Sequence, residues 1–155
     1  MIINLIRFAG LLLTSLVVGT TFGIWLGYNP SGLSPATYVE QQQKAIGALN
    51  TIMPVLGAAC ILLNSALAVL TKADSRTRYL LIASVIFLIA AGLITRFGNQ
   101  PINAIVMTWS AQAPAANWIE LRDSWWQWHI LRTSAGLVAL VLLLLAALRN
   151  PKRSH

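Results

Sequence analysis

The chain has 155 residues, of which 57% are hydrophobic and only 10% are charged, and its formal net charge is +7. A soluble globular protein carries about 25% charged residues, so this composition excludes a disordered chain and an ordinary soluble enzyme. The basic residues stand in short clusters between long apolar runs, which argues against a nucleic acid as partner. We therefore expect one integral membrane domain, residues 1–155, with lipid around it.

Four long apolar segments are predicted to cross the membrane as helices, since about 20 apolar residues suffice for about 30 Å of hydrocarbon. The predicted spans are residues 8–27, 51–71, 79–96 and 132–148. The first segment could instead be a cleaved signal peptide, but it lacks an A-x-A-like cleavage site and is read as a retained span. The expected fold is all-α: an integral membrane four-helix bundle, with two outer helical segments that cap it or lie on it.

The distribution of basic residues predicts the orientation of this bundle. With four spans, seven of the eleven Lys and Arg residues fall on one side, and the positive-inside rule makes that side cytoplasmic. The protein is then expected in the cell membrane with both termini cytoplasmic, together with the loop 72–78 and the tail 149–155. Segments 28–50 and 97–131 are outside. A fifth span after residue 96 is not expected, because that segment has too many polar and helix-breaking residues to face lipid, among them Asn99, Gln100, Pro101 and Asn103.

Small residues recur along the first span, where Gly19, Gly23 and Gly27 form two overlapping G-x-x-x-G units. Such stripes allow helix backbones to approach closely in lipid, so close packing within the bundle is expected. The alternative is that Gly23 and Gly27 leave room for a flat ligand. Whether the chain forms a homo-oligomer is left open.

The first outer segment is predicted to contain a helix that begins at Pro35 and is capped by Ser34. One face of this helix carries Gln42 and continues with Ile46, Leu49 and Met53. We expect this face to lie against the bundle. The glutamine run 41–43, which includes Gln42, either forms a solvated face or lines the mouth of a cavity.

The second outer segment is predicted to start a new helix at Pro101, capped by Asn99 or Gln100, whose N-terminal amides would favour an anion. A further helix should begin after Pro114 and run into the fourth span. That helix carries a stripe spaced 4, 3, 4 and 3 residues apart, which places its members on one face. The stripe is Trp118, Arg122, Trp125, His129 and Arg132.

Three explanations fit this stripe: an aromatic belt with snorkelling arginines, a pocket at the outer end of the bundle, or a docking face for a partner protein. Ionisable residues at membrane depth are costly and indicate function by default. Arg96 and Arg132 could pair with Glu40, Glu120 or Asp123, or Arg132 could hold an enolate or carboxylate. One internal histidine and one cysteine cannot build a metal cluster, so neither a metal nor a bound cofactor is expected.

Two outer motifs resemble the anthrone oxygenase-like family of small four-helix membrane proteins. The motifs are Asn99-Gln100-Pro101-Ile102-Asn103 and the run from Trp125 to Thr133, and weaker similarity extends from Gly23 through Met53-Pro54. The resemblance implies a cofactor-independent oxygenase, an oxidoreductase that converts an anthrone to an anthraquinone. Relatives often have asparagine at the position of His129, so the resemblance favours Arg132, Asn99 and Asn103 as shared groups.

The resemblance and the stripe together motivate a mechanism. A flat lipophilic substrate would stack near Trp125 or Trp128, His129 would remove a carbon-bound proton, and Arg132 with the Asn amides would stabilise the enolate that reacts with dioxygen. The rival hypothesis is a non-catalytic membrane subunit or lipid-binding protein that docks a partner; a permease is a third. The candidate catalytic residues are His129 and Arg132. The candidate substrate-binding residues are Asn99, Asn103, Trp125, Trp128, Arg96 and Gln42.

Overall fold

The computed structural model describes residues 1–71 and 74–149, and in these the chain is helical almost throughout, without a β-strand. The elements in chain order are α1 (Ile2–Gly27), the 3-10 turn η1 (Pro30–Gly32), α2 (Pro35–Leu49), α3 (Ile52–Leu70), α4 (Ser75–Ile94), the π-helical turn η2 (Thr95–Asn99), α5 (Gln100–Val106) and α6 (Trp118–Leu148).

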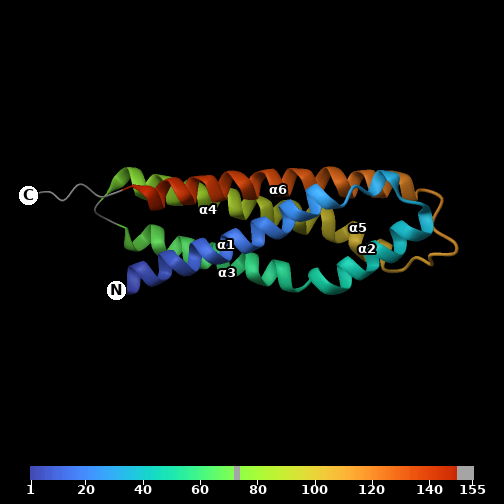
Figure 1. Cartoon of the computed structure of the whole chain (residues 1–155), viewed down its shortest axis with the longest axis horizontal. Coiled ribbons are helices and arrows are strands. Elements are labelled where there is room, and N and C mark those ends of the chain that lie inside the picture. Colours follow the sequence, from blue (N-terminus) through green and yellow to red (C-terminus); the bar gives the residue numbers. More distant parts are fainter. Residues whose placement is uncertain (72–73, 150–155) are drawn as a thin grey trace, which may run out of the picture.

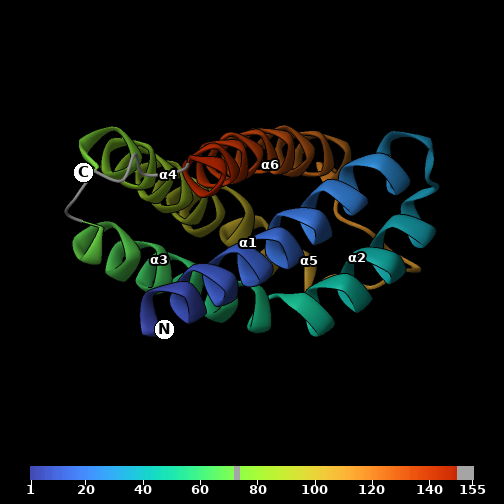
Figure 2. The ribbon, with the colours of Figure 1, turned by 60° about the vertical axis from the view of Figure 1, so that its left-hand side comes forward.

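Four long helices form the bundle, and each is apolar enough to cross a membrane. Helices α4 and α6 lie together in one layer, α1 and α3 lie in the other, and contacts between α3 and α4 and between α1 and α6 close the ring (Figures 1 and 2). The shortest of the four, α3, has 19 residues and is about 28 Å long at 1.5 Å per residue, which matches the hydrocarbon thickness. The expected all-α membrane bundle is confirmed.

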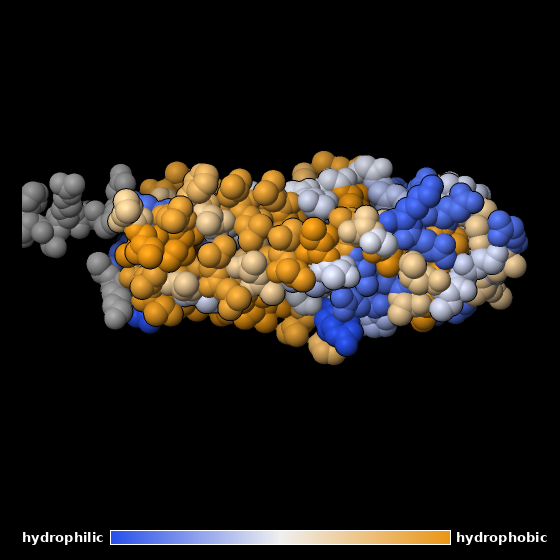
Figure 3. Space-filling model, turned by 90° about the horizontal axis from the view of Figure 1, so that it is seen from below, coloured by the Kyte–Doolittle hydropathy of each residue, from blue (hydrophilic) through white to orange (hydrophobic). Residues whose placement is uncertain are grey.

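The remaining elements gather at one end of the molecule. Helix α1 begins and α6 ends at the same end, and η1, α2 and α5 lie at the opposite end, which we call the distal end (Figure 1). They extend the bundle along its long axis and do not lie across its side. Hydrophilic residues gather at the distal end in the view of Figure 3, whereas the rest of that face is mostly hydrophobic. Such a distribution of hydrophilic and hydrophobic residues is expected when the distal end lies in water or among lipid headgroups.

Buried polar side chains tie the helices together within the apolar part of the bundle. The Asn64 amide of α3 donates to the hydroxyl of Thr14 on α1 at 3.0 Å, and Ser84 of α4 donates to the carbonyl of Ala139 on α6 at 2.8 Å. Both bonds lie where no water competes, so they favour one register of each helix pair.

The glycine stripe of α1 does not pack inside this chain, contrary to the sequence prediction. A Cβ placed on Gly19, Gly23 or Gly27 would meet no atom within 4 Å. The close approaches occur instead at Gly10, where a Cβ would lie 2.9 Å from Asn64 Oδ1, and at Gly136, 3.3 Å from Val18 Cγ2. The reason is the rotation of α1, which turns the face of Thr14 and Val18 inward and leaves the glycine face outside.

The expected break between the third span and a helix at Pro101 is also wrong, because α4, η2 and α5 form one continuous helical path. Proline cannot donate a backbone hydrogen bond, and the helix adapts just before Pro101 with a π turn in which the Gln100 N–H donates to Thr95 O. Asn99 stands at the N-cap position of α5, but its backbone is already helical and its side chain makes no capping hydrogen bond. No free N-terminus is therefore left there for an anion.

The two other distal helices follow the sequence prediction. Helix α2 begins at Pro35, and the hydroxyl of Ser34 accepts from the Thr37 N–H. Helix α6 runs without interruption from Trp118 into the apolar part of the bundle. The distal residues of α6 are therefore connected to its membrane segment by one continuous helix.

Candidate functional site

A cavity of about 260 Å³ lies at the distal end, between α1, α2, α5 and α6. The predicted inner face of α2 supplies Gln42, Ile46 and Leu49, and Met53 follows at the start of α3. Tyr28, Asn103, Trp125 and Arg132 line the other sides. We call it the distal cavity. Its walls are mainly apolar with a few converging polar groups, which is the usual composition of a small-molecule site.

A second cavity, of about 300 Å³, lies deeper among α1, α3, α4 and α6 and is called the mid-bundle cavity. Its walls carry small residues, among them Gly57, Ala58 and Gly92. The two cavities share five lining residues, which are Thr21, Met53, Pro54, Thr95 and Arg132. Arg132 thus stands at the junction and borders both spaces.

Arg132 is held by His129, one helical turn earlier on α6. Its Nη2 lies 2.9 Å and its Nε 3.2 Å from Nδ1 of His129. The guanidinium carbon also lies 6.0 Å from the ring centroid of Trp125, in cation–π contact. No carboxylate lies within ion-pair distance of Arg132 among the described residues. The side chain therefore carries a positive charge into the bundle without a counter-ion from residues 1–71 and 74–149.

His129 is fully buried, and both of its ring nitrogens are engaged. Because an arginine only donates, Nδ1 must accept, so the proton resides on Nε2, which lies 3.1 Å from the carbonyl oxygen of Thr21 and donates to it. The ring borders neither cavity. In this arrangement His129 positions Arg132 and offers no lone pair to a bound molecule.

An aromatic stack surrounds the histidine ring. The rings of Trp125 and Trp126 lie parallel to it, with centroids 5.2 and 5.4 Å away, and Tyr28, directly after α1, packs edge-on against both indoles. This stack fixes the rotamers of Trp125 and His129. A flat ligand in the distal cavity would meet the exposed side of a rigid aromatic wall.

A chain of side-chain amides fixes the other wall of the distal cavity. The indole Nε1–H of Trp125 donates to Asn103 Oδ1 at 2.8 Å, and the Asn103 amide donates to Asn50 Oδ1 at 2.8 Å. Asn99 donates to the backbone oxygen of Trp125 at 3.0 Å. These bonds connect α6, α5 and the turn between α2 and α3. Asn99 and Asn103 were predicted to bind substrate, but here their amide N–H groups and the Asn103 oxygen are bonded within the protein.

The predicted site residues therefore separate into groups. Gln42, Asn103, Trp125 and Arg132 all line the distal cavity, while Arg96 lines the mid-bundle cavity and donates to Gln100. Asn99 is buried behind Trp125 and borders neither cavity. Trp128 points away from both: it is 41% exposed and packs against Gly98, where a Cβ would lie 2.6 Å from its ring.

The ion pair found at the distal end among the described residues does not line either cavity. Arg122 forms an ion pair with Asp123 at 2.8 Å and lies over the ring of Trp118, 5.0 Å from its centroid. The suggested pairing of Arg96 or Arg132 with Glu40, Glu120 or Asp123 is not found among the described residues. Nearby, burial raises the pKa of the Tyr38 phenol well above its usual range, so Tyr38 stays neutral.

Sequence reasoning missed Thr21, Asn50 and Thr95 as parts of the site. Thr21 accepts from His129 and, like Thr95, lines both cavities, whereas Asn50 ends the amide chain from Trp125. The signals for Asn50 were its position directly before an apolar span and the weaker family similarity that includes it. Threonines within apolar helices carry no comparable signal, because their hydroxyls can bond to their own helix.

One wall of the distal cavity carries a buried polar atom that has no hydrogen-bond partner in the described structure. Gln42 is 1% exposed; its Oε1 accepts from the phenol of Tyr28 at 3.1 Å, and its Nε2 has no partner in the described structure. A buried amide donor without an acceptor is costly unless a ligand or water supplies one. The cavity thus offers a bound molecule donors from Gln42 and Arg132.

Comparison with known proteins agrees with the sequence motifs. A family model described as anthrone oxygenase matches residues 43–142, more than half of the chain, and this range includes Asn50, Asn103, Trp125 and Arg132. The searches of curated proteins and of solved structures gave no match. The chain therefore belongs to the anthrone oxygenase family, with a four-helix membrane bundle and two adjoining cavities that meet at a half-buried arginine.

Proposed function

We propose that the protein is a membrane oxygenase that converts a flat, lipophilic, enolisable aromatic ketone of the anthrone class to the corresponding quinone. The observation that carries this proposal is Arg132, a cation that faces both cavities and has no carboxylate partner among the residues that the structure describes. An unpaired charge inside a bundle is costly. A ligand that becomes anionic during the reaction would offset that cost as its negative charge develops.

The reaction balances without an external reductant. The substrate methylene loses one proton and gives an enolate, and dioxygen takes electrons from the enolate carbon and forms a C–O bond, so that protonation gives a hydroperoxide. Loss of water from the hydroperoxide leaves the carbonyl group. One oxygen atom of dioxygen enters the product and the other becomes water, and the four electrons that dioxygen needs come from the methylene group itself.

The residues divide this work between charge stabilisation and positioning. Arg132 stabilises the enolate oxygen, and Gln42 offers a second donor to it. Trp125 and Tyr28 provide the aromatic wall against which the rings stack, and the amide chain through Asn103 keeps that wall in place. Oriented donors of this kind typically contribute about 10²–10³ in rate. We assign to His129 the positioning of Arg132, and the substrate proton leaves to solvent.

The test compares the wild-type protein with Arg132→Ala and Arg132→Lys in lipid nanodiscs, and follows anthrone oxidation by absorbance in air, under argon and with a chelator. We expect oxygen-dependent turnover that the chelator does not change. Arg132→Ala should lose about 10²–10³ in kcat. Arg132→Lys should recover only part of it, because a lysine cannot hold the forked contact with His129.

Lys44→Gln is the control, since Lys44 is exposed on α2 and lines neither cavity. It removes the same charge and should leave turnover unchanged. Full activity of a folded Arg132→Ala protein would overturn the proposal. Binding of the aromatic ketone without any turnover would instead favour a non-catalytic lipophile-binding protein built on the same cavity.

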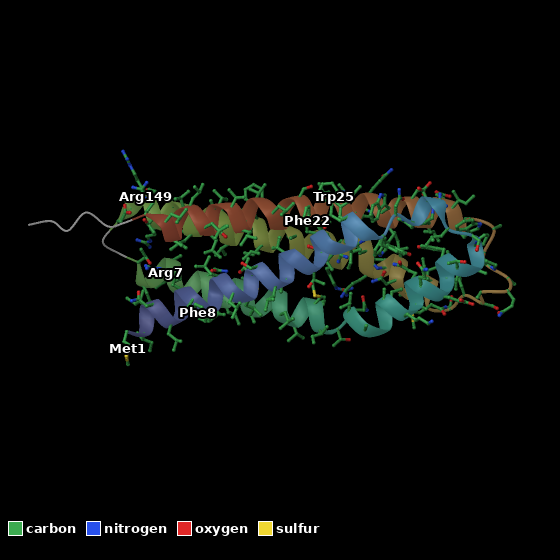
Figure 4. All side chains as sticks on the ribbon, in the orientation of Figure 1. Met1, Arg7, Phe8, Phe22, Trp25 and Arg149 are labelled. Carbon is green, nitrogen blue, oxygen red and sulfur yellow. The ribbon has the colours of Figure 1, made fainter. Side chains whose placement is uncertain are left out.

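We further propose that the protein resides in the cell membrane with the distal end away from the cytoplasm. Arg7 and Arg149 lie at the opposite end (Figure 4), and Arg76 and Arg78 begin α4 there. A membrane-impermeant maleimide applied to intact cells should label Ser31→Cys in the distal turn and spare Ser75→Cys. The reverse pattern would invert the topology.

A further inference from the structure

The mid-bundle cavity opens sideways, onto the surface that faces lipid. Pro54 and Ala58 of α3 and Gly92 of α4 line the cavity and are also exposed at the surface of the bundle. These residues lie on facing helices in the apolar part of the molecule. The space between them is thus a mouth toward the hydrocarbon, separate from the distal end.

Glycine keeps this mouth wide. A Cβ added to Gly57 or Gly92 would meet no atom within 4 Å, so neither glycine is needed for helix contact. Close packing explains Gly10, Gly98 and Gly136, where a Cβ would lie 3.3 Å or less from a neighbour. At Gly57 and Gly92 the missing side chain leaves open space in the cavity wall.

The inner end of this space reaches the proposed reaction centre. Thr21, Thr95 and Arg132 border both cavities, so a molecule that enters between α3 and α4 arrives at the guanidinium and then at the aromatic wall of the distal cavity. The walls change along this path from Gly57, Ala58 and Ile61 to the polar groups around Arg132. Such a gradient suits a substrate with apolar rings and one polar oxygen.

We infer that the mid-bundle cavity is a lateral entrance through which the lipophilic aromatic substrate passes directly from the bilayer to Arg132, between α3 and α4. The inference rests on the proposed function for the identity of the substrate. The position of the entrance between α3 and α4 does not depend on which reaction follows. An entrance changes the rates of arrival and departure together, whereas a binding subsite changes the affinity, and this difference makes the inference testable.

The experiment measures binding of a dihydroxyanthraquinone, a flat probe that resembles the product and is not turned over. The full-length protein is placed in nanodiscs, the probe is delivered from lipid vesicles in a stopped-flow instrument, and quenching of Trp125 and its neighbours reports arrival in the distal cavity. The variants are Gly57→Leu and Gly92→Leu, which add a side chain at the mouth where the new Cβ would meet no atom within 4 Å. Ala58→Leu at the exposed rim is a third variant, should either glycine replacement impair folding.

Gly19→Leu is the matched control, because Gly19 is an equally open, lipid-facing glycine of α1 that lines neither cavity. We expect Gly57→Leu and Gly92→Leu to slow both association and dissociation by about tenfold or more, with an unchanged Kd. Gly19→Leu should behave as the wild type does. Near-ultraviolet circular dichroism checks that each variant is folded.

Three results would overturn the inference: unchanged rates in all folded mouth variants, a raised Kd with an unchanged association rate, or no binding of the probe to the wild type. The first would place the entrance at the distal end, and the second would make the cavity a subsite. Failure of the proposed function looks different. In that case the probe would bind with the expected kinetics, while anthrone would not be oxidised by the wild type.

Discussion

Arg132 Nη2 lies 2.9 Å from Nδ1 of His129, and this contact decides the role of the histidine. A guanidinium has only donors, so it occupies the one lone pair that a neutral imidazole could offer as a base. The opposite nitrogen is bound to the carbonyl of Thr21 on α1. The histidine thus links α1 to the arginine and fixes the direction in which the positive charge points.

The first prediction concerns replacement of this histidine. His129→Asn keeps a side-chain oxygen that can accept from Arg132, so we expect its turnover of anthrone to stay within about tenfold of the wild type. A true general base contributes about 10²–10⁴ in rate, and an asparagine could not replace it. His129→Leu removes the acceptor and should reduce activity well below His129→Asn. Steady-state kinetics in nanodiscs distinguish the two roles.

Loss of more than about 10² in rate in a folded His129→Asn protein would restore the histidine as base. Equal activity of the Asn and Leu variants would show that the contact with Arg132 has no functional consequence. Folding is checked by circular dichroism, because both variants remove the histidine ring from the aromatic stack and would change tryptophan fluorescence even in a folded protein.

The second prediction concerns the indole nitrogen of Trp125, which donates to Asn103 at 2.8 Å. Trp125→Phe keeps an aromatic ring but leaves the Asn103 oxygen without its donor. A buried group left unsatisfied in this way costs about 1–3 kcal/mol. Equilibrium unfolding in mixed micelles should show that loss, together with a higher KM, because the wall of the distal cavity loosens.

Trp128→Phe is the comparison for this variant. Trp128 lies on the same helix but is 41% exposed and borders neither cavity. Its replacement should change the free energy of unfolding by no more than about 0.5 kcal/mol and leave KM unaltered. Equal effects of the two replacements would contradict the network.

The third prediction concerns the bond between Asn103 and Asn50, whose side chains lie 2.8 Å apart. A double-mutant cycle with Asn50→Ala and Asn103→Ala should yield a coupling free energy. Interhelical hydrogen bonds in membrane proteins average about 0.6 kcal/mol and reach about 1.7. We expect the upper part of this range, since Asn103 also bonds to Trp125. Additive effects would mean that the two amides do not interact.

The fourth prediction concerns Gly98, the buried glycine of the π turn. A Cβ there would lie 2.6 Å from Cγ and Cδ2 of Trp128, near the root of that side chain, where the indole has little freedom to move. Gly98→Ala should therefore cost about 1–3 kcal/mol through overpacking. Combining it with Trp128→Ala should remove that cost.

Gly19→Ala serves as the reference for Gly98→Ala, since no atom lies within 4 Å of the added methyl. It should be neutral or slightly stabilising, because alanine favours the helix over glycine. Both variants are compared by unfolding in mixed micelles. Equal stabilities would show that the indole moves aside without cost.

The fifth prediction concerns acid stability at the end of the bundle opposite the cavities. Asp74 caps α4, and the hydroxyl of Thr77, followed by Arg149, lowers the pKa of its carboxyl below the usual value. A group whose pKa is lower in the folded protein stabilises it above the unfolded pKa, and this contribution is lost as pH falls through the folded pKa. Unfolding midpoints should therefore drop on acidification, and less so in Asp74→Asn. Identical pH profiles would show that the ionised carboxylate of Asp74 does not stabilise the fold.

The sequence alone predicts much of the architecture, because lipid exposure and helix periodicity are local properties. Long uncharged segments must be helices in hydrocarbon, since every backbone group has to be satisfied within the segment. The Ser34-Pro35 start of α2 and the inward face of Gln42 and Ile46 follow from capping chemistry and the 3.6-residue repeat. The stripe that brings Trp125 and His129 to one face of α6 follows from the same repeat.

The tertiary structure decided which polar groups meet, and the physical reason is that such contacts join positions far apart in the chain. The bond between His129 and Thr21, like the bond between Asn103 and Asn50, depends on how each helix is rotated in the bundle. Rotation also decided that Gly98 is a packing glycine while Gly19 faces outward. Sequence periodicity places Arg132 on a face, but only the packed bundle places it between two cavities, where no carboxylate of the described part of the chain pairs with it.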